Sequence, residues 1–514
     1  MPPAPRPQTL LEAIWSSLIW GVLDRATGLI KHIFIATTVG LSAELDVFYM
    51  ANALLTLFVN SWSRIADVIA VPRLVALQKN DPQKVRQLCG DLFSLSLLFS
   101  AGLGMLLNLG WDSLAELIWG GDPARRALLS AALYWSEPLV LLTIPVSMLY
   151  SFAKARKAFY LRYRNDFLTS LTILSAVALW PDAPGVLLWS YSLGLMLSFT
   201  VALFESRRDL VFWGNPISPA IRQLLPLAPA LLVLYGVDYL YALINRQFVA
   251  ALPPGTVSAV AYALTLAKLL PSLLRVDGAF MTFYAETKDQ PKQRDDRVNS
   301  LLSTGIVVGV GLTLIVQLFA EDFVRLALEH GKFHRDNTLM VSRCTRLFGF
   351  AMIPFLLLPA LGQICQVENR LKLLMRRTLL GLVLNISCAA LLIFVYDFGA
   401  AGVAVSTSLS QWGMFLLSLV LVERLGLVIQ FSRHAGWLLT TLIYGLAAAA
   451  LGQILGTLVP GLGGLILEAV SFLGGYSLLV LLGRDPDSGV ARILFRRAME
   501  KLRSRRPRSL SKTL

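Results

Sequence analysis

Long hydrophobic segments recur along the whole chain, and short polar segments separate them. Most are about 20 residues long, which is the length that a helix needs to cross a bilayer. Counting these segments predicts about 14 transmembrane helices. Their approximate ranges are 10–37, 46–71, 90–109, 128–152, 167–180, 184–204, 223–250, 257–283, 299–319, 341–364, 378–396, 400–422, 435–457 and 462–482. The pattern therefore predicts an all-α polytopic membrane protein without a soluble domain.

An internal repeat divides the predicted helices into two sets. The segment 24–54 aligns without a gap on 238–268, which places Asp24 on Asp238. The two copies begin the first and the seventh hydrophobic segment, as a duplication of six helices requires. Transporters are often built from such repeats, with the binding site at the repeat interface. We expect a pseudo-symmetric pair of six-helix lobes over 1–222 and 223–432, two extra transmembrane helices over 433–483, and a basic cytoplasmic tail over 484–514.

Composition and charge distribution agree with a membrane protein. The chain has 514 residues, of which 56% are hydrophobic, and its mean hydropathy is +0.64. A net charge of +14 would suit nucleic acid, but Lys and Arg concentrate in alternate loops and in the C-terminal tail. Loops on the cytoplasmic side of a membrane are enriched in these residues. We therefore expect both termini in the cytoplasm, a place in the bacterial inner membrane, and no nucleic-acid partner.

The sequence carries no recognisable motif for a metal site or for catalysis. The four cysteines (Cys89, Cys344, Cys365 and Cys388) lie in or beside hydrophobic segments without metal-ligand spacing, which indicates packing. The four histidines form no metal pair, and no glycine-rich phosphate loop carries the required lysine. We expect a transporter rather than an enzyme, with no catalytic residue, no metal and no cofactor. Its energy then comes from an ion gradient, the membrane potential or the gradient of the cargo.

Several ionisable residues lie inside the hydrophobic segments, where charge is costly and usually contacts a partner or a substrate. We take Arg25, Lys31, Arg64 and Lys268 as candidate ligands of an anionic substrate. Asp24, Asp46 and Asp238 are candidates for charge pairing or for binding a coupling ion. The remaining charges at this depth are Arg246, Arg275, Arg343, Arg346, Asp67 and Asp277.

Two interpretations of these charges remain open. In the functional one, the cations line a water-filled cleft between the lobes and hold a pyrophosphate, which the planar fork of Arg binds well. In the structural one, the aspartates neutralise the cations and pin helices together, or long side chains reach the membrane interface. The functional interpretation fits Arg25 best. The structural interpretation fits Arg246 and Arg275 best, and the two interpretations fit Arg64 and Lys268 equally well.

Three dispersed stretches carry a resemblance to a known family. They are Arg25-Ala-Thr-Gly28-Leu-Ile-Lys31 with the following Gly40 and Asp46-Val-Phe48, then Leu328-Glu-His-Gly331-Lys332-Phe333, and then 385–407. The first is similar to the pattern R-x-x-G-x-x-R…G…D-x-F, and the second is similar to the G-K/R-F motif before a tenth helix. Together they resemble the MurJ/MviN lipid II flippases of the MOP exporter superfamily, which also contains the MATE transporters.

The resemblance implies two lobes around a cationic central cavity that opens alternately to the two sides of the membrane. It implies further that the two C-terminal helices form a groove for a polyprenyl tail. By position, Arg25 and Lys31 match the two cations that the family has in its first helix, with Lys in place of Arg at the second. Asp46 matches the acid at the start of the second helix.

The chain departs from the family pattern in its second and eighth helices. Apolar residues stand where the family has arginines, at Phe58-Val59 and Leu266, and its glutamate positions hold Ser63 and Leu269. Arg64 and Lys268 are the nearby cations, which substitute for the missing ones only if their side chains reach the same cavity.

From these observations we expect a flippase that moves an undecaprenyl-pyrophosphate-linked glycan, lipid II or a similar precursor, from the inner to the outer leaflet by alternating access. An exopolysaccharide repeat-unit flippase of the same superfamily is one alternative. A non-transporting membrane scaffold is another, which the departures favour. A drug exporter would need an acidic or apolar cavity. Expected partners are the lipid-linked glycan, membrane lipids, and proteins of cell-wall or polysaccharide synthesis.

Overall fold

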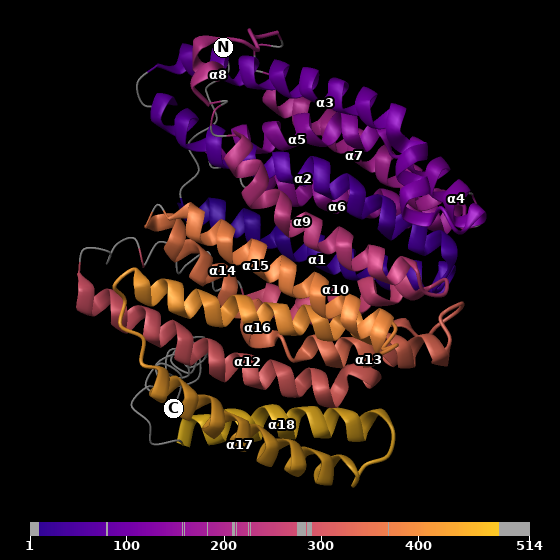
Figure 1. Ribbon diagram of the computed structural model, residues 1–514, viewed down its shortest axis with the longest axis vertical. Helices are drawn as coiled ribbons and strands as arrows, with labels where there is room; N and C mark the ends of the chain where they lie inside the picture. Colours follow the sequence, from indigo (N-terminus) through magenta and orange to yellow (C-terminus); the bar gives the residue numbers. More distant parts are fainter. Residues whose placement is uncertain are drawn as a thin grey trace, which may run out of the picture. The chain divides into compact units, whose positions relative to one another are not determined.

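The computed structural model is helical and contains no strand in the part of the chain that it describes (Figure 1). That part is 10–482 without 79–80, 157, 159, 182, 184, 208–210, 212, 225, 227, 275–283, 285–289 and 369. The helices of the first half are α1 (Leu10–Val39), α2 (Ala43–Gln78), α3 (Pro82–Trp119), α4 (Pro123–Trp135), α5 (Glu137–Ala155), α6 (Tyr160–Leu179), α7 (Val186–Ser206), α8 (Pro219–Leu224) and α9 (Ala228–Ala250). The rest are α10 (Thr256–Leu274), α12 (Pro291–Leu328), α13 (Arg335–Gly349), α14 (Met352–Val367), α15 (Leu371–Ala390) with the π-helix η2 (Leu391–Val395), α16 (Ala400–Arg424), α17 (Phe431–Gly456) and α18 (Leu462–Leu482).

The chain forms two compact units. The first comprises Met1–Tyr262, Phe323–Val341 and Ala389–Val403, and the second comprises Ala263–Asp322, Ser342–Cys388 and Ala404–Leu514. Both units are therefore assembled from segments that are distant in the sequence. The lobe boundary after residue 222 stays a prediction.

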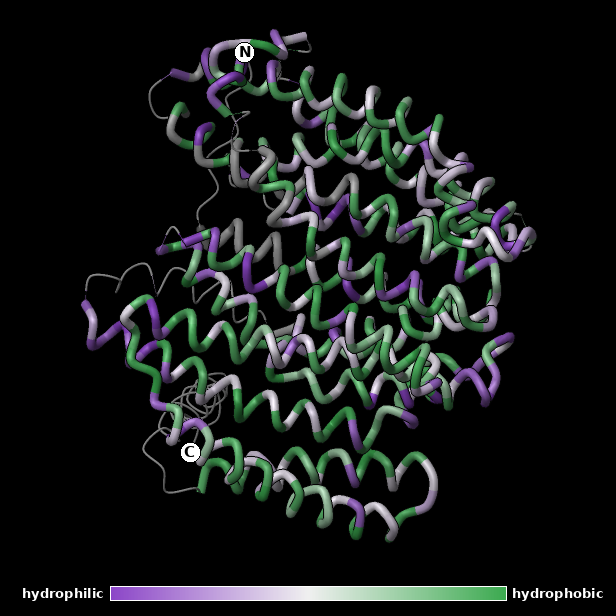
Figure 2. The backbone as a smooth tube through the Cα atoms, in the orientation of Figure 1, coloured by the Kyte–Doolittle hydropathy of each residue, from purple (hydrophilic) through white to green (hydrophobic). Residues whose placement is uncertain are grey.

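Eight of the described helices are long and apolar enough to cross a membrane, and α13 with α14 makes a ninth if this pair, bent by 50°, is one span. The eight are Gln83–Trp119, Glu137–Ala155, Val186–Ser206, Pro291–Leu328, Leu371–Val395, Ala400–Arg424, Phe431–Gly456 and Leu462–Leu482. Hydrophobic residues run along most of the length of α17 and α18, as Figure 2 shows. The structure confirms the all-α membrane protein, whereas the count of 14 spans stays a prediction. The long helices α1, α2 and α6 carry ionisable residues within their length.

The two C-terminal helices form a hairpin that packs on α12 in the second unit (Figure 1). The Tyr476 hydroxyl donates a hydrogen bond of 2.6 Å to the carbonyl oxygen of Val307, and the Phe472 side chain is fully buried. Gly311 makes the close approach possible, because a Cβ there would lie 2.9 Å from the Tyr476 ring. Inside a bilayer, helices associate through such small residues and interhelical hydrogen bonds.

Helices α6 and α7 of the first unit pack by the same means. The Thr169 hydroxyl lies 2.9 Å from that of Ser198, and the Asn165 amide donates to the Ser198 carbonyl oxygen at 3.0 Å. A Cβ on Gly194 would lie 2.9 Å from the Cα atom of Thr169. Because that neighbour is main chain, it cannot rotate away. Glycine at 194 therefore sets the distance between α6 and α7.

We predict that Gly194→Leu separates α6 from α7 and lowers the stability of the protein by about 1–3 kcal/mol, the usual cost of overpacking. Thermal unfolding in detergent, followed by fluorescence or size exclusion, measures the effect. Gly102→Leu is the matched control, because a Cβ at Gly102 meets no atom within 4 Å. Equal midpoints for both variants would contradict the packing described here.

Candidate functional site

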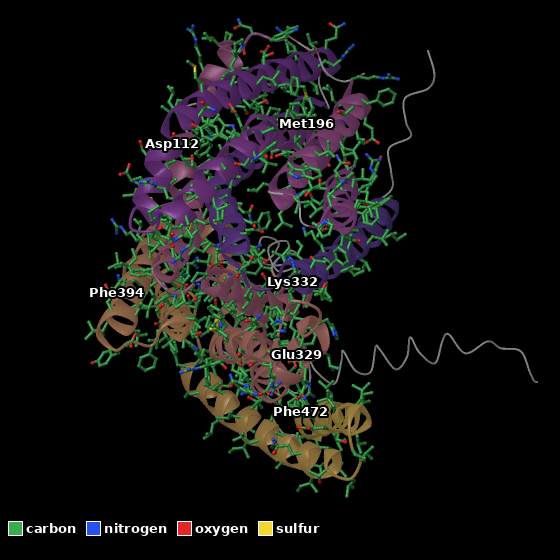
Figure 3. The ribbon with its side chains drawn as sticks, turned by 90° about the vertical axis from the view of Figure 1, so that its right-hand side faces the viewer. Asp112, Met196, Glu329, Lys332, Phe394 and Phe472 are labelled. Carbon is green, nitrogen blue, oxygen red and sulfur yellow. The ribbon has the colours of Figure 1, made fainter. Side chains whose placement is uncertain are left out.

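Two of the sequence motifs meet in the first unit, at a place we call the motif junction: the α1–α2 turn, the α9–α10 turn and 329–334. The Lys332 amide donates a hydrogen bond of 2.9 Å to the Thr37 carbonyl oxygen at the end of α1. Gly40 and Gly331 both have positive φ, at 70° and 57°. A Cβ on Gly331 would overlap the Thr37 carbonyl oxygen, and one on Gly40 would lie 2.8 Å from the Lys332 carbonyl oxygen. Both positions therefore need glycine for conformation and for space. Lys332 is labelled in Figure 3.

Asp46 connects α2 to the start of α10 at this junction. Its side chain is completely buried, and one carboxylate oxygen accepts a hydrogen bond of 2.6 Å from the Gly255 amide. The other oxygen accepts bonds of 2.7 Å from both the amide and the hydroxyl of Ser258. A negative charge at a helix N-terminus is stabilised by the free amides and the helix dipole. Asp46 thus caps a helix that begins more than 200 residues later in the chain.

An aromatic cluster fills the space beneath these bonds. The Tyr262 hydroxyl of α10 donates to the His32 carbonyl oxygen of α1 at 3.3 Å, and the Tyr49 hydroxyl of α2 lies 3.4 Å from Nδ1 of His32. The Tyr262 ring also meets those of Tyr49 and Phe333 edge to face, with centroids 5.8 and 6.3 Å apart. Such pairs stabilise beyond their buried area. The Phe333 ring therefore anchors 329–334 in the first unit.

Two arginines bind main-chain carbonyl oxygens near this junction, Arg125 those of the α9–α10 turn and Arg246 one on α2. Nη1 of Arg125 donates to the carbonyl oxygens of Ala250 and Leu252, each at 3.2 Å, while its Nε atom pairs with Asp122 at 2.6 Å. Hydrogen bonds from the Arg125 side chain and backbone lower the pKa of Asp122, which lies in the loop before α4. Arg246 donates to the Tyr49 carbonyl oxygen and lies 5.7 Å from the centroid of its ring. These contacts support the structural interpretation of Arg246.

The cations of α1 lie away from this junction. Lys31 Nζ donates to the Ser170 hydroxyl of α6 at 3.4 Å, and the charges of Asp24 and Asp166 act on it. Arg25 is partly exposed and forms no hydrogen bond or ion pair with any residue that the structure describes. Since consecutive helix residues are rotated by about 100°, Arg25 points off the stripe of Asp24 and Lys31. Within the described part of the chain, Arg25 is therefore the α1 cation that has no side-chain partner.

Asp166 is a functional candidate that the sequence interpretation missed. The hydrophobic segment was expected to begin at 167, whereas α6 begins at Tyr160 and includes Asp166. The spacing of Arg162, Asp166 and Ser170 was the available signal, because residues four apart share one face of a helix. Arg162 pairs with Asp166 at 3.7 Å on this face.

The other predicted site residues are placed less completely. Lys268 belongs to the second unit, where it is exposed and its ammonium lies 5.2 Å from the centroid of the Phe355 ring. Arg64 lies on α2 and Asp238 on α9, but their side chains are outside the described residues. Arg275 and Asp277 also lie outside the described residues, as does the Asp67 side chain. Among the candidates, the structure places Asp24 and Lys31 on one stripe of α1, with Arg25 off that stripe, and Asp46 at the motif junction.

We predict that Asp46→Ala destabilises the protein by about 1–3 kcal/mol, because it leaves buried amides at the start of α10 without an acceptor. The midpoint of thermal unfolding in detergent should fall, and amide exchange near Gly255 and Ser258 should accelerate. Ser258→Ala removes only one of the bonds and should have a smaller effect. A wild-type exchange rate in Asp46→Ala would show that the carboxylate does not cap α10.

Comparisons with known proteins identify the family to which the chain is related. A sequence model of the family "Lipid II flippase MurJ" matches residues 35–463, which is most of the chain. A "Probable lipid II flippase MurJ" of Buchnera aphidicola is 23% identical over 430 residues, covering 79% of this chain and 83% of the relative. A relative with the same description from Thermotoga maritima is 20% identical over 402 residues, covering 76% and 81%.

Solved structures show the same fold. A lipid II flippase MurJ in an inward closed conformation matches with a TM-score of 0.76 and 16% identity, covering 96% of this chain and all of that one. An inward-facing MATE multidrug transporter of the MOP superfamily matches with a TM-score of 0.65 and 10% identity, covering 80% and 98%. The chain therefore shares its fold with these two transporters, and the family match extends across the helices that carry the motif junction. The chain belongs to the lipid II flippase MurJ family.

Proposed function

We propose that this protein moves a polyprenyl-pyrophosphate-linked glycan, with lipid II as the first candidate, from the inner to the outer leaflet of the bacterial inner membrane. Its membership of the flippase family carries the proposal. Two curated relatives are described as probable lipid II flippases, and this chain aligns with more than four fifths of the length of each. It is a transporter rather than an enzyme, and both termini lie in the cytoplasm.

The cations of α1 supply the chemistry for the head group. Arg25 offers a planar fork that donates two parallel hydrogen bonds to phosphate oxygens, and Lys31, six residues later, offers a compact charge. Lys268 is exposed on α10 and is a third candidate ligand. Arg64 is a fourth, by its sequence position. A pyrophosphate brings negative charge to residues whose own burial in lipid would be costly, so substrate and site neutralise each other.

The motif junction provides a closure that can be broken. Asp46 lies in the first copy of the internal repeat, and its partners Gly255 and Ser258 lie in the second. Alternating access moves one repeat against the other. We infer that the Asp46 hydrogen bonds hold the transporter closed toward one side of the membrane and break when it opens to that side. Asp46 then sets the orientation of α10 relative to α2 in the closed state. This role requires no coupling ion at the Asp46 carboxylate.

The first test replaces a cell's own lipid II flippase with this chain and labels lipid II in the outer leaflet. We predict survival with labelled lipid II for the wild type. Arg25→Ala should lower the transport rate by about 10- to 100-fold, since a hydrogen bond to a charged group contributes about 1.5–3 kcal/mol. Arg25→Lys keeps the charge and should retain part of the rate.

Arg126→Ala is the control for this series, because Arg126 is an exposed arginine in the first turn of α4. Membrane amounts of all variants are measured in parallel. Normal transport by Arg25→Ala would contradict the role of Arg25 in binding pyrophosphate. Failure of the well-expressed wild type to transport lipid II would contradict lipid II as the cargo.

The proposed orientation has its own test. In a variant without its four native cysteines, Thr457→Cys marks the turn between α17 and α18, and Gln83→Cys marks the start of α3. Both positions are exposed. A membrane-impermeant maleimide should label 457 in spheroplasts but 83 only after lysis, since the positive-inside rule places the loop before α3 in the cytoplasm. The opposite pattern would reverse the proposed orientation.

A further inference from the structure

Helices α1 and α6 run alongside each other in the same direction through the first unit. The Trp20 and Phe167 ring centroids lie 5.8 Å apart, and farther along both helices Lys31 Nζ lies 3.4 Å from the Ser170 hydroxyl. The two helices therefore share a seam along which their side chains contact one another.

This seam carries a set of charged and polar residues that we call the α1–α6 ladder: Asp24 and Lys31 on α1, and Arg162, Asp166 and Ser170 on α6. Asp24 and Lys31 are seven residues apart, so they lie on one stripe of α1. Arg162 pairs with Asp166 at 3.7 Å, and Asp166 interacts electrostatically with both Asp24 and Lys31. With two cations and two carboxylates, the ladder is neutral as a whole.

The ladder is open to solvent on one side. The side chains of Arg162 and Asp166 are 50% and 46% exposed, and a Cβ on Gly28, between Asp24 and Lys31 on the α1 stripe, would meet no atom within 4 Å. Charges facing hydrocarbon would be expensive, so the open side faces water. The phenols of Tyr150 on α5 and Tyr191 on α7 also interact electrostatically with Asp166.

We propose that Asp166 is a positioning residue of the pyrophosphate site. It neutralises Lys31 in the empty transporter and releases Lys31 when the substrate binds. The inference rests on the proposed function and deepens it. An arriving pyrophosphate competes with Asp166 and Asp24 for the Lys31 ammonium. The carboxylates therefore weaken binding, and they draw Lys31 back to α6 when the head group leaves. Arg25 lies off the ladder and makes its contact with the substrate without this competition.

The test uses the full-length protein in liposomes, with binding of undecaprenyl pyrophosphate and flipping of lipid II measured separately. We predict that Asp166→Asn, which keeps the shape and removes the charge, binds undecaprenyl pyrophosphate about two- to fivefold more tightly, the ratio expected for one partly exposed charge–charge interaction. Its maximal flipping rate should fall, because release slows. Asp166→Glu restores the charge and should restore wild-type values of both.

Glu205→Gln is the matched control, because Glu205 pairs with Arg164 of α6 at 2.6 Å outside the ladder. Its affinity should equal that of the wild type. A loss of folded protein without a change in affinity would make Asp166 purely structural and overturn the inference. If Asp166→Asn does not fold, Asp24→Asn decides, since it relieves the same lysine and should tighten binding as well.

The outcomes for the wild type separate this inference from the proposed function. Binding of undecaprenyl pyrophosphate without flipping of lipid II would refute lipid II as cargo and still test Asp166 through the affinities. Failure to bind either molecule would overturn both. Equal affinities of the wild type, Asp166→Asn and Asp24→Asn would overturn the ladder alone.

Discussion

The need to satisfy every polar group inside a bilayer governs this structure. An unpaired carboxylate or amide in hydrocarbon costs several kcal/mol, so each one needs a partner or water. Asp46 shows the constraint most clearly, because its two oxygens accept three hydrogen bonds at the start of α10 while its side chain is fully buried. The aromatic cluster around Tyr262 packs next to these bonds, and the glycines of the motif junction permit the close approach of its segments. The junction is therefore a stable contact that only a concerted movement of its helices can break.

The same constraint separates two kinds of charge in the first unit. The guanidinium of Arg246 is bound to the carbonyl oxygen and ring of Tyr49, and that of Arg125 is bound to carbonyl oxygens of the α9–α10 turn. The α1–α6 ladder is different, because its ion pair is half exposed and Gly28 leaves open space beside it. Charges that are satisfied by main chain hold helices together. Charges that balance one another beside water can exchange partners with a ligand, and this is where we propose that the substrate binds.

Hydrophobic periodicity predicted the helical membrane fold, because segment length and apolar composition follow directly from bilayer thickness. The motifs around Gly40, Asp46 and Gly331 were also visible as residues. Their partners were not, since the hydrogen bond between Asp46 and Gly255 joins positions that no local pattern connects. Asp166 was not predicted as a site residue, because the first turns of α6, from Tyr160 on, are polar and do not show in the hydropathy pattern. Arg64, Asp238 and Lys268 remain candidates by position, because hydropathy does not reveal which cavity a side chain faces.

The long-range cap at Asp46 has a consequence for biogenesis. Gly255 follows Asp46 by 209 residues, so at 5–20 residues per second the ribosome needs about 10–40 s to deliver the partner. For most of that interval α2 is complete, while the Asp46 carboxylate has no helix to cap. The nascent chain must keep Asp46 hydrated at the membrane surface or inside the insertion machinery until α10 arrives. The cap at Asp46 can therefore form only after the ribosome has reached the second repeat, so this contact does not assemble in the order of synthesis.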